Sequence, residues 1–403
     1  MKVHGYAASV AVAALLAAGP LAAQGISDGK VKIGIMNDQS GVYADSTGRT
    51  SVEAARQAVE DFGGTVLGAP IEIVAADHQN KTDIGSNIAR QWYDVEQVDT
   101  IMDLPTSSVA LAVQALSLER GKVTIAVGGG SAVISGAQCT PLAFQWAYDT
   151  EMLSRVVGGA LVDQGGDSWY FLTADYVFGH SLEQATTKIV EAKGGKVLGS
   201  VRHPLATTDY SSFLLQAQAS GAKVIGLASA GLDTANAIKQ GQEFGITAGG
   251  QKFAALLFTL TDVRGLGAEA AQGLVMTEAY YWDHDDESRA LGEKIKARAG
   301  VYPNSLHAGT YSAVMQYLKA IEAAGTDEGK AVAAKLHEMP VHDAFARNGK
   351  VLPNGRMVSD VFLLEVKKPS DMTGTDDFFN VLATVPGEQA NVSAKDSGCP
   401  LTQ

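Results

Sequence analysis

Small hydroxyl residues and glycines follow two of the apolar runs that are typical of strands. The segment 105–108 (PTSS) comes after one run and opens a helical pattern, and the segment 128–131 (GGGS) comes after the next run. Hydroxyl groups and backbone N–H groups at a helix N-terminus bind an anion without lysine or arginine, and glycine lets a ligand approach the backbone closely. The residues that we predict to hold a ligand carboxylate are Thr106, Ser107, Gly129, Gly130 and Ser131.

Both segments also have an ordinary structural explanation. Hydroxyl residues at 106–108 are typical N-caps of a helix that begins near Val109, and glycines after a strand are typical of a tight turn. These explanations are compatible with ligand binding, so they stay open on the sequence alone.

The chain lacks the signatures of the common catalytic and cofactor sites. It contains no HExxH, GxSxG or GxxxxGK(S/T) motif, and no GxGxxG motif after its first strand. Its eight histidines are scattered, and no spacing of cysteine and histidine is typical of zinc. We interpret His180 and His203 as solvated or structural, and the run 285–287 (DDE) as an exposed loop. We therefore expect no enzyme activity, no cofactor and no metal site.

The elements that must position these loops alternate along the chain. Strands are predicted at 31–36, 71–75, 100–104 and 123–127, with helices at 48–62, 83–95 and 109–119. The pattern then restarts, with helices at 151–164, 181–193, 210–219 and 233–243 and strands at 168–173, 197–203, 224–228 and 253–258. Two late strands are predicted at 274–279 and 361–366, and a polar tail follows Ser370. This order predicts two similar α/β units, each with a parallel sheet covered by helices.

The composition restricts the partners of the chain. Its 403 residues carry a formal net charge of −13, and basic runs are absent. An acidic surface disfavours nucleic acid and anionic lipid as partners. No segment after the N-terminus is apolar for long enough to cross a bilayer, which needs about 20 residues, so we expect a protein that is not inserted in a membrane.

The first 23 residues have the pattern of a secretory signal peptide. Lys2 precedes an apolar run over 7–18, a Gly-Pro pair breaks the run, and small residues surround Ala23. We expect cleavage after Ala23, with Gly25 as the alternative position. The other interpretation, an N-terminal anchor helix, requires a longer apolar run than this one. Export predicts a periplasmic protein of about 380 residues, which suggests two domains at roughly 100–200 residues each.

The two cysteines, Cys139 and Cys399, are far apart in the sequence. An exported protein meets an oxidising compartment, so we predict a disulfide between them that ties down the C-terminal tail. Such a bond stabilises a fold by about 2–4 kcal/mol. The alternative is a pair of buried thiols.

Several stretches together resemble the type I periplasmic binding proteins, specifically the group similar to the branched-chain amino acid (Leu/Ile/Val) binding proteins. They are VKIGIMNDQSGVYAD, LPTSSVALAVQ, IAVGGGS, ADYVFGHS, AGLDTANAIKQGQEFGI and QGLVMTEAYYW, and the resemblance runs from about Lys30 to Leu401. It implies two Rossmann-like lobes joined by three crossover segments, with residues 27–147 and 276–352 in lobe 1 and 148–275 and 357–403 in lobe 2. It also implies a cleft that closes on a ligand and a permease of an ABC transporter as the partner.

The resemblance also implies roles for single residues. By position, Thr106 matches a hydroxyl that binds the ligand carboxylate, Gly129 and Gly130 match backbone donors, and Ser131 matches the next hydroxyl. In lobe 2, Phe178 lies where amino-acid binders often carry tyrosine, and Ala230 or Gly231 lies where another aromatic residue is common. The predicted ligand-binding set is completed by Tyr43 and Phe258, which lie after a strand of lobe 1 and at the end of a strand of lobe 2.

One departure from the family pattern affects the ligand. Leu/Ile/Val binders hold the ligand ammonium with an acidic residue after the last strand of lobe 2, whereas this chain has Leu-Phe-Thr at 257–259 and its next acid at Asp262. A buried ammonium without a carboxylate partner is costly. Aromatic residues could instead hold a ring, unless they pack in the core; the candidates are Tyr43, Phe178, Tyr281 and Trp282.

We therefore expect a solute-binding protein that delivers a small aromatic or related organic acid to an ABC importer. The alternative ligand is a branched-chain amino acid or a small amide, for which Asp175, Asp262 or Glu278 must bind the ammonium group. More distant alternatives are a periplasmic enzyme and a sensory receptor domain.

Overall fold

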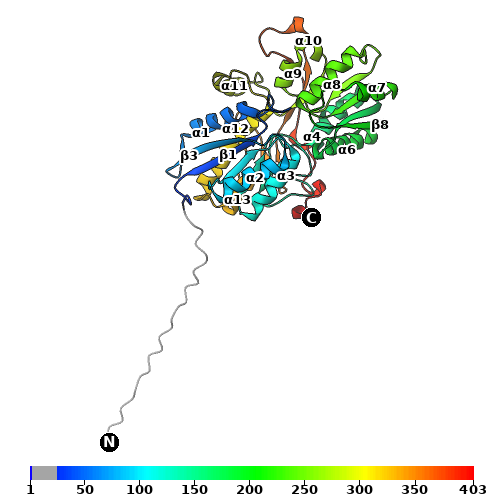
Figure 1. Ribbon diagram of the computed structural model, residues 1–403. Coiled ribbons are helices and arrows are strands. Elements are labelled where there is room, and N and C mark those ends of the chain that lie inside the picture. The colour runs from blue at the N-terminus through cyan, green and yellow to red at the C-terminus, as the bar shows by residue number, and fades with distance from the viewer. Residues whose placement is uncertain (2–24) are drawn as a thin grey trace.

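The computed structural model describes Met1 and residues 25–403 of the chain. The predicted signal peptide, apart from Met1, lies outside these residues. Two α/β lobes lie side by side, and the chain passes between them three times (Figure 1). None of the helices in the described part of the chain is long and apolar enough to span a bilayer.

Lobe 1 is built on a six-stranded sheet with the order β2-β3-β1-β4-β5-β6, in which only the β2–β3 pair is antiparallel. The strands are β1 (Val31–Asn37), β2 (Thr65–Val66), β3 (Ala69–Asp77), β4 (Thr100–Asp103), β5 (Val123–Ala126) and β6 (Ala143–Gln145). The central strands β1, β4 and β5 are buried along almost their whole length, which fits a parallel sheet that is covered on both faces.

The helices of lobe 1 lie on both faces of this sheet. They are α1 (Gly48–Phe62), α2 (Thr82–Asp94), α3 (Ser107–Glu119), α11 (Asp286–Ala299), α12 (Ser305–Ala324) and α13 (Gly329–Glu338). α1 packs against α12, while α2 packs against α3 over a separate apolar cluster that includes Trp92 (Figure 1). A short hairpin of β12 (Lys350–Val351) and β13 (Met357–Val358) follows α13.

Lobe 2 contains a parallel sheet with the order β10-β9-β7-β8. The strands are β7 (Ser168–Ala174), β8 (Lys196–His203), β9 (Val224–Ala228) and β10 (Lys252–Ala255). The helices are α4 (Thr150–Leu153), a π-helical turn η1 (Ser154–Gly158), α5 (Gly159–Asp163), α6 (Val177–Ala192), α7 (Ser211–Ala219), α8 (Gly231–Glu243), α9 (Leu260–Leu266) and α10 (Ala268–Ala271). The two lobes thus repeat one strand–helix pattern, as the sequence predicts.

A second, antiparallel sheet lies beside β10. It has the order β11-β14-β15, with β11 (Val275–Glu278), β14 (Val361–Val366) and β15 (Phe379–Val385). The three crossover segments are therefore 146–149, 279–285 and 359–360. The parallel sheets of the two lobes lie within the residue ranges predicted for them, and the boundaries themselves stay a prediction.

Three expectations about elements were wrong. The strand predicted at 253–258 ends at Ala255, because Thr259 and Asp262 form a capping box that begins α9. The run 285–287 is the start of α11 rather than a loop, since the Asp285 carboxylate accepts the Ser288 N–H at 2.7 Å as an N-cap. The polar tail after Ser370 contains β15, whose side chains are largely exposed at the edge of its sheet.

The C-terminal tail returns from β15 to lobe 1 through α14 (Gly387–Ala390). There Cys399 forms a disulfide with Cys139, with their Cα atoms 5.6 Å apart, across a sequence separation of 260. The predicted bond is confirmed, and the alternative of two buried thiols is excluded.

Candidate functional site

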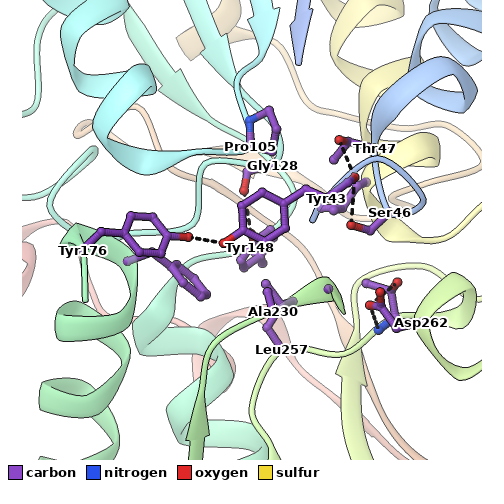
Figure 2. Close-up of a pocket in the computed structure, with 14 residues that line it drawn as sticks. Tyr43, Ser46, Thr47, Pro105, Gly128, Tyr148, Tyr176, Ala230, Leu257 and Asp262 are labelled. Carbon is purple, nitrogen blue, oxygen red and sulfur yellow. Dashed lines mark hydrogen bonds between the residues drawn. The ribbon is translucent and has the colours of Figure 1, made fainter. Parts of the chain in front are cut away.

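A cavity of about 340 Å³, counted with the space that opens to solvent, lies between the two lobes (Figure 2). It lies at the carboxyl ends of the parallel strands, where open α/β sheets bind ligands. The residues that line it are Tyr43, Ser46, Thr47, Pro105, Gly128, Tyr148, Tyr176, Phe178, Ala230, Gly231, Leu257, Thr259, Asp262 and Leu306.

The loop after β1 carries Tyr43 into this cavity. The buried carboxylate of Asp38 organises the loop, because its Oδ2 accepts the Tyr43 N–H at 2.9 Å and the Asn80 side-chain amide at 2.5 Å. The hydroxyls of Ser46 and Thr47 donate to the Tyr43 carbonyl at 3.3 and 3.0 Å. Tyr43 is thus fixed from both sides of its own backbone.

The Tyr43 ring reaches across the cleft to lobe 2. Its hydroxyl oxygen lies 2.6 Å from that of Tyr176, and Figure 2 shows the two phenols meeting end to end. Burial raises the pKa of Tyr43 and the pKa of Tyr176 above the usual value. Both phenols therefore keep their protons at neutral pH.

Two further rings complete an aromatic wall with Tyr43 and Tyr176. Tyr148 donates its hydroxyl to the Gly128 carbonyl at 2.5 Å and meets the Phe178 ring edge to face, with ring centroids 6.5 Å apart. Tyr176 lies against Phe178 at a centroid distance of 6.1 Å. Such arrangements are favourable between aromatic rings, and the same surfaces suit a flat ligand ring.

The N-terminus of α8 contacts lobe 1 at Gly231. Gly231 has a φ of +57°, and a Cβ atom there would lie 2.3 Å from the Val42 carbonyl oxygen. The next residue, Leu232, donates its N–H to that same oxygen at 3.1 Å. Only glycine permits both the left-handed conformation and the close approach.

A third interlobe contact lies at the N-terminus of α12. The side-chain amide of Asn304 donates to the hydroxyls of Thr259 and Thr261 in lobe 2 at 3.3 and 3.0 Å, and to the Ser46 carbonyl of lobe 1 at 3.0 Å. Together with the contacts at Tyr43 and Gly231, this bond holds the lobes together in a closed arrangement.

Asp262 is the one charged side chain among the described residues that line the cavity. Its side chain is 8% exposed, and its Oδ2 accepts the Thr259 N–H at 2.8 Å and the Thr259 hydroxyl at 2.7 Å. Burial raises the pKa of Asp262 to about 6, although the Thr259 hydrogen bonds oppose the shift. The cavity therefore offers a carboxylate to a ligand but no cationic side chain.

Two buried acids lie behind the cavity wall. Asp103 accepts a hydrogen bond from the Asn37 amide at 2.9 Å, and burial raises its pKa to about 7. Glu278 accepts the Leu260 N–H at 2.9 Å and bonds from Ser305, and burial raises its pKa to about 7. Neither lines the cavity, so both act on the framework rather than directly on a ligand.

The sequence profile of the family described as "Periplasmic binding protein" matches residues 30–373. The chain belongs to this family. A Leu/Ile/Val-binding protein homolog 6 of Brucella melitensis is 28% identical over 370 residues, which are 89% of this chain and 93% of that relative.

Two solved structures with substantial sequence identity share the fold. A periplasmic binding protein from Burkholderia mallei is 47% identical, with a TM-score of 0.92, and the match covers 94% of this chain and all of the other. A branched-chain amino acid ABC transporter periplasmic ligand-binding protein from Burkholderia xenovorans is 37% identical, with a TM-score of 0.83, and the match covers 93% and 100%. This periplasmic binding protein is thus a solute-binding component of the ABC transporter family.

The structure brings three of the predicted ligand-binding residues together in the cavity, namely Tyr43, Phe178 and Gly231. Phe258 is fully buried, and its neighbours Leu257 and Thr259 face the cavity instead.

At each of the two predicted carboxylate loops, the residue just before the predicted ones lines the cavity. Pro105 and Gly128 line the cavity, while the residues that follow them turn inward. Thr106 donates its hydroxyl to the Asn80 side chain, and the Ser131 N–H donates to the Ser107 hydroxyl at 3.1 Å.

The two glycines of this loop are needed for packing. A Cβ atom on Gly130 would lie 2.2 Å from the Tyr148 ring, and one on Gly129 would lie 2.8 Å from the Leu104 carbonyl oxygen. Whether Thr106, Ser107, Gly129, Gly130 and Ser131 bind the ligand stays a prediction.

Sequence reasoning missed several lining residues, above all Tyr148 and Tyr176. Tyr176 lies two positions before Phe178 in the ADYVFGHS stretch, which was the available signal. Asp262, which is predicted only as an ammonium ligand for the alternative amino acid, lines the cavity because α9 begins at Leu260 and turns this side chain toward the cleft.

Other candidates have structural roles. Trp282 stacks on Tyr302 at a centroid distance of 3.6 Å, and Tyr281 packs against Phe379 at 5.5 Å, so neither lines the cavity. His180 bonds Asp175 at 2.8 Å on the surface, and His203 is buried. The histidines therefore have the solvated and structural positions expected from the sequence.

Proposed function

We propose that this chain is the periplasmic receptor of an ABC importer for a small aromatic carboxylate. The observation that carries the proposal is the interlobe cavity, in which Tyr43, Tyr148, Tyr176 and Phe178 supply aromatic surface from both sides of the cleft. A ring bound there contacts both lobes, and a ligand that contacts both lobes stabilises the closed form.

Closure sets the energy that the ligand must supply. A shift from 1% to 99% closed requires about 5.5 kcal/mol of preferential binding to the closed form. The lobes already share direct bonds through Tyr43, Leu232 and Asn304, so the closed form has a stability of its own. The ligand therefore has to supply only the part of this free energy that the direct bonds between the lobes do not supply. A small molecule with few polar groups is able to do so.

A second ligand class is favoured by Asp262. Its carboxylate lines the cavity and has the charge that an amino acid's ammonium group needs. Of the three acids considered from the sequence, Asp175 is exposed and Glu278 lies behind the wall. An α-amino acid with a branched or aromatic side chain is therefore the alternative ligand.

The other parts of the proposal follow from the family. Its members and the solved structures of similar sequence are ligand-binding proteins, and we propose a binding role without catalysis for this chain as well. Export through the predicted signal peptide and delivery of the ligand to a membrane permease complete the proposed role.

The test is a thermal-shift and calorimetry panel of benzoate, 4-hydroxybenzoate, cinnamate, phenylalanine and leucine. We expect the aromatic acids to raise the melting temperature and to bind with the highest affinity. Stabilisation by leucine or phenylalanine alone would replace the aromatic acid with the amino-acid alternative. Native mass spectrometry of the freshly purified protein would identify a molecule that co-purifies, and turnover of a bound ester or amide would contradict the binding role.

A further inference from the structure

Two hydroxyl groups from opposite lobes meet inside the cavity. Tyr43 comes from the loop after β1, and Tyr176 is the N-cap residue of α6. Their oxygen atoms lie 2.6 Å apart, which is a short O–H···O distance. The contact exists only when the lobes are closed, since each lobe supplies one partner.

One of the two hydroxyl hydrogens of the pair is not donated within the pair. Each phenol carries one O–H group, and the raised pKa values keep both groups protonated. One O–H donates to the other oxygen, which leaves the second O–H to donate elsewhere. No further hydrogen bond of either hydroxyl is formed with residues 25–403 of the chain. The pair is half-buried and lines the cavity, so its remaining O–H can donate to a ligand that brings an acceptor.

The surroundings of the pair select the charge of that acceptor. The nearby Tyr148 hydroxyl is already donated to the Gly128 carbonyl. Asp262, the charged group of the wall, lies on the far side of the cavity from Tyr176 (Figure 2). An anion at the tyrosine pair is therefore kept away from the acid, and a charged acceptor forms the stronger hydrogen bond.

We infer that the Tyr43–Tyr176 pair binds the ligand carboxylate and is the specificity-determining contact that links ligand binding to closure. This inference rests on the proposed function, and it moves the carboxylate from the loops at 106–107 and 129–131 to the interlobe hydroxyl pair. A ligand of the same shape without an anionic acceptor gains less from closure.

The experiment compares benzoate and its neutral isostere benzamide in the variants Tyr43→Phe and Tyr176→Phe. Each substitution removes one hydroxyl and keeps the ring. We expect each to weaken benzoate binding about tenfold to a hundredfold, which corresponds to one hydrogen bond to a charged group, and to weaken benzamide much less. The double variant is expected to lose no more than about the larger single loss, because the pair acts as one unit.

The matched control is Tyr170→Phe. Tyr170 belongs to lobe 2 and lies on β7, outside the cavity. It is expected to bind benzoate as the unmodified protein does. Melting curves of the ligand-free variants check that the fold is retained.

The outcomes separate this inference from the proposed function. Unchanged benzoate affinity in both phenylalanine variants would overturn the inference and leave the receptor function standing. An equal loss for benzoate and benzamide would also overturn it, since the pair would then be a ligand-independent latch. If only leucine binds, the aromatic ligand is excluded, and a loss of leucine affinity in Tyr176→Phe supports the inference while no loss overturns it. If no acid in the panel binds, both proposals fail.

Discussion

The backbone of lobe 2 contacts lobe 1 at Gly231 and Leu232, which lie against the Val42 carbonyl. Alanine in place of Gly231 is strained by the left-handed conformation, at about 1–2 kcal/mol, and its Cβ clashes with the Val42 carbonyl oxygen only in the closed form. We expect Gly231→Ala to weaken ligand binding at least tenfold. Calorimetry with the preferred ligand measures the change.

The control for this variant is Gly245→Ala. Gly245 also has a positive φ, +71°, but a Cβ there meets nothing within 4 Å. Both variants carry the backbone strain, and only Gly231→Ala carries the interlobe clash. Equal affinities in the two variants would show that the closed form tolerates a side chain at Gly231.

Asp262 is expected to make stability depend on pH. Its pKa rises from 3.8 to about 6 on folding, so the folded state binds more protons than the unfolded state between these values. Folding stability therefore falls as the pH rises from about 4 to 7. We expect Asp262→Asn to remove this loss, and hence to be more stable than the unmodified protein at pH 7.5 by up to about 3 kcal/mol.

Melting curves of the two proteins from pH 4 to pH 8 test this prediction. The difference in melting temperature should grow with pH and nearly vanish at pH 4. Asp209→Asn is the control, because hydrogen bonds lower the pKa of the exposed Asp209 and give the opposite sign. A constant difference across the range would mean that Asp262 has an ordinary pKa.

At the scale of elements, the loop after β1 depends on one carboxylate. Asp38 accepts the N–H groups of Gly41 and Tyr43 and the amide of Asn80. Asparagine keeps one acceptor oxygen and leaves at least one of these donors unpaired, at a cost of about 1–3 kcal/mol. We expect Asp38→Asn to lower the melting temperature and to weaken ligand binding severalfold, because Tyr43 loses its fixed position.

Calorimetry and melting curves measure both effects. The control is Asp28→Asn, which alters an exposed acid of the same lobe whose one backbone hydrogen bond is long, at 3.4 Å. A loss of stability without any change in affinity would show that Tyr43 is positioned by something other than this loop.

Strands and helices with a clear period were predictable from the sequence, whereas exposed or capped ends were not. β9 (Val224–Ala228) and α1 (Gly48–Phe62) have the predicted bounds, because burial imposes a strict pattern on them. β15 was missed, since its exposed side chains carry no apolar alternation.

The same limit applies to the cavity. The sequence placed its wall at the correct strand ends, which topology dictates. It could not show whether Pro105 or Thr106 faces inward, because a shift of one residue depends on how each loop turns. Nor could it pair Tyr43 with Tyr176, since their contact requires the relative position of two lobes.

At the scale of the whole molecule, the disulfide connects the C-terminal tail to lobe 1, and none of the three crossover segments makes this connection. The tail leaves β15 beside lobe 2 and is bonded through Cys399 to Cys139 in lobe 1. Because the bond joins residues 260 positions apart, it restricts the unfolded chain strongly. Bonds of this kind stabilise a fold by about 2–4 kcal/mol.

We therefore expect reduction to lower the melting temperature of the intact protein by several degrees. The variant with serine at both Cys139 and Cys399 should melt at the same lower temperature with and without reductant, which separates loss of the bond from side effects of the reagent. Mass spectrometry after alkylation confirms the redox state of each sample. Identical melting of the oxidised and reduced proteins would mean that packing of the tail against lobe 1, where Ser397 lies beside Gly136, is sufficient to hold it without the covalent bond.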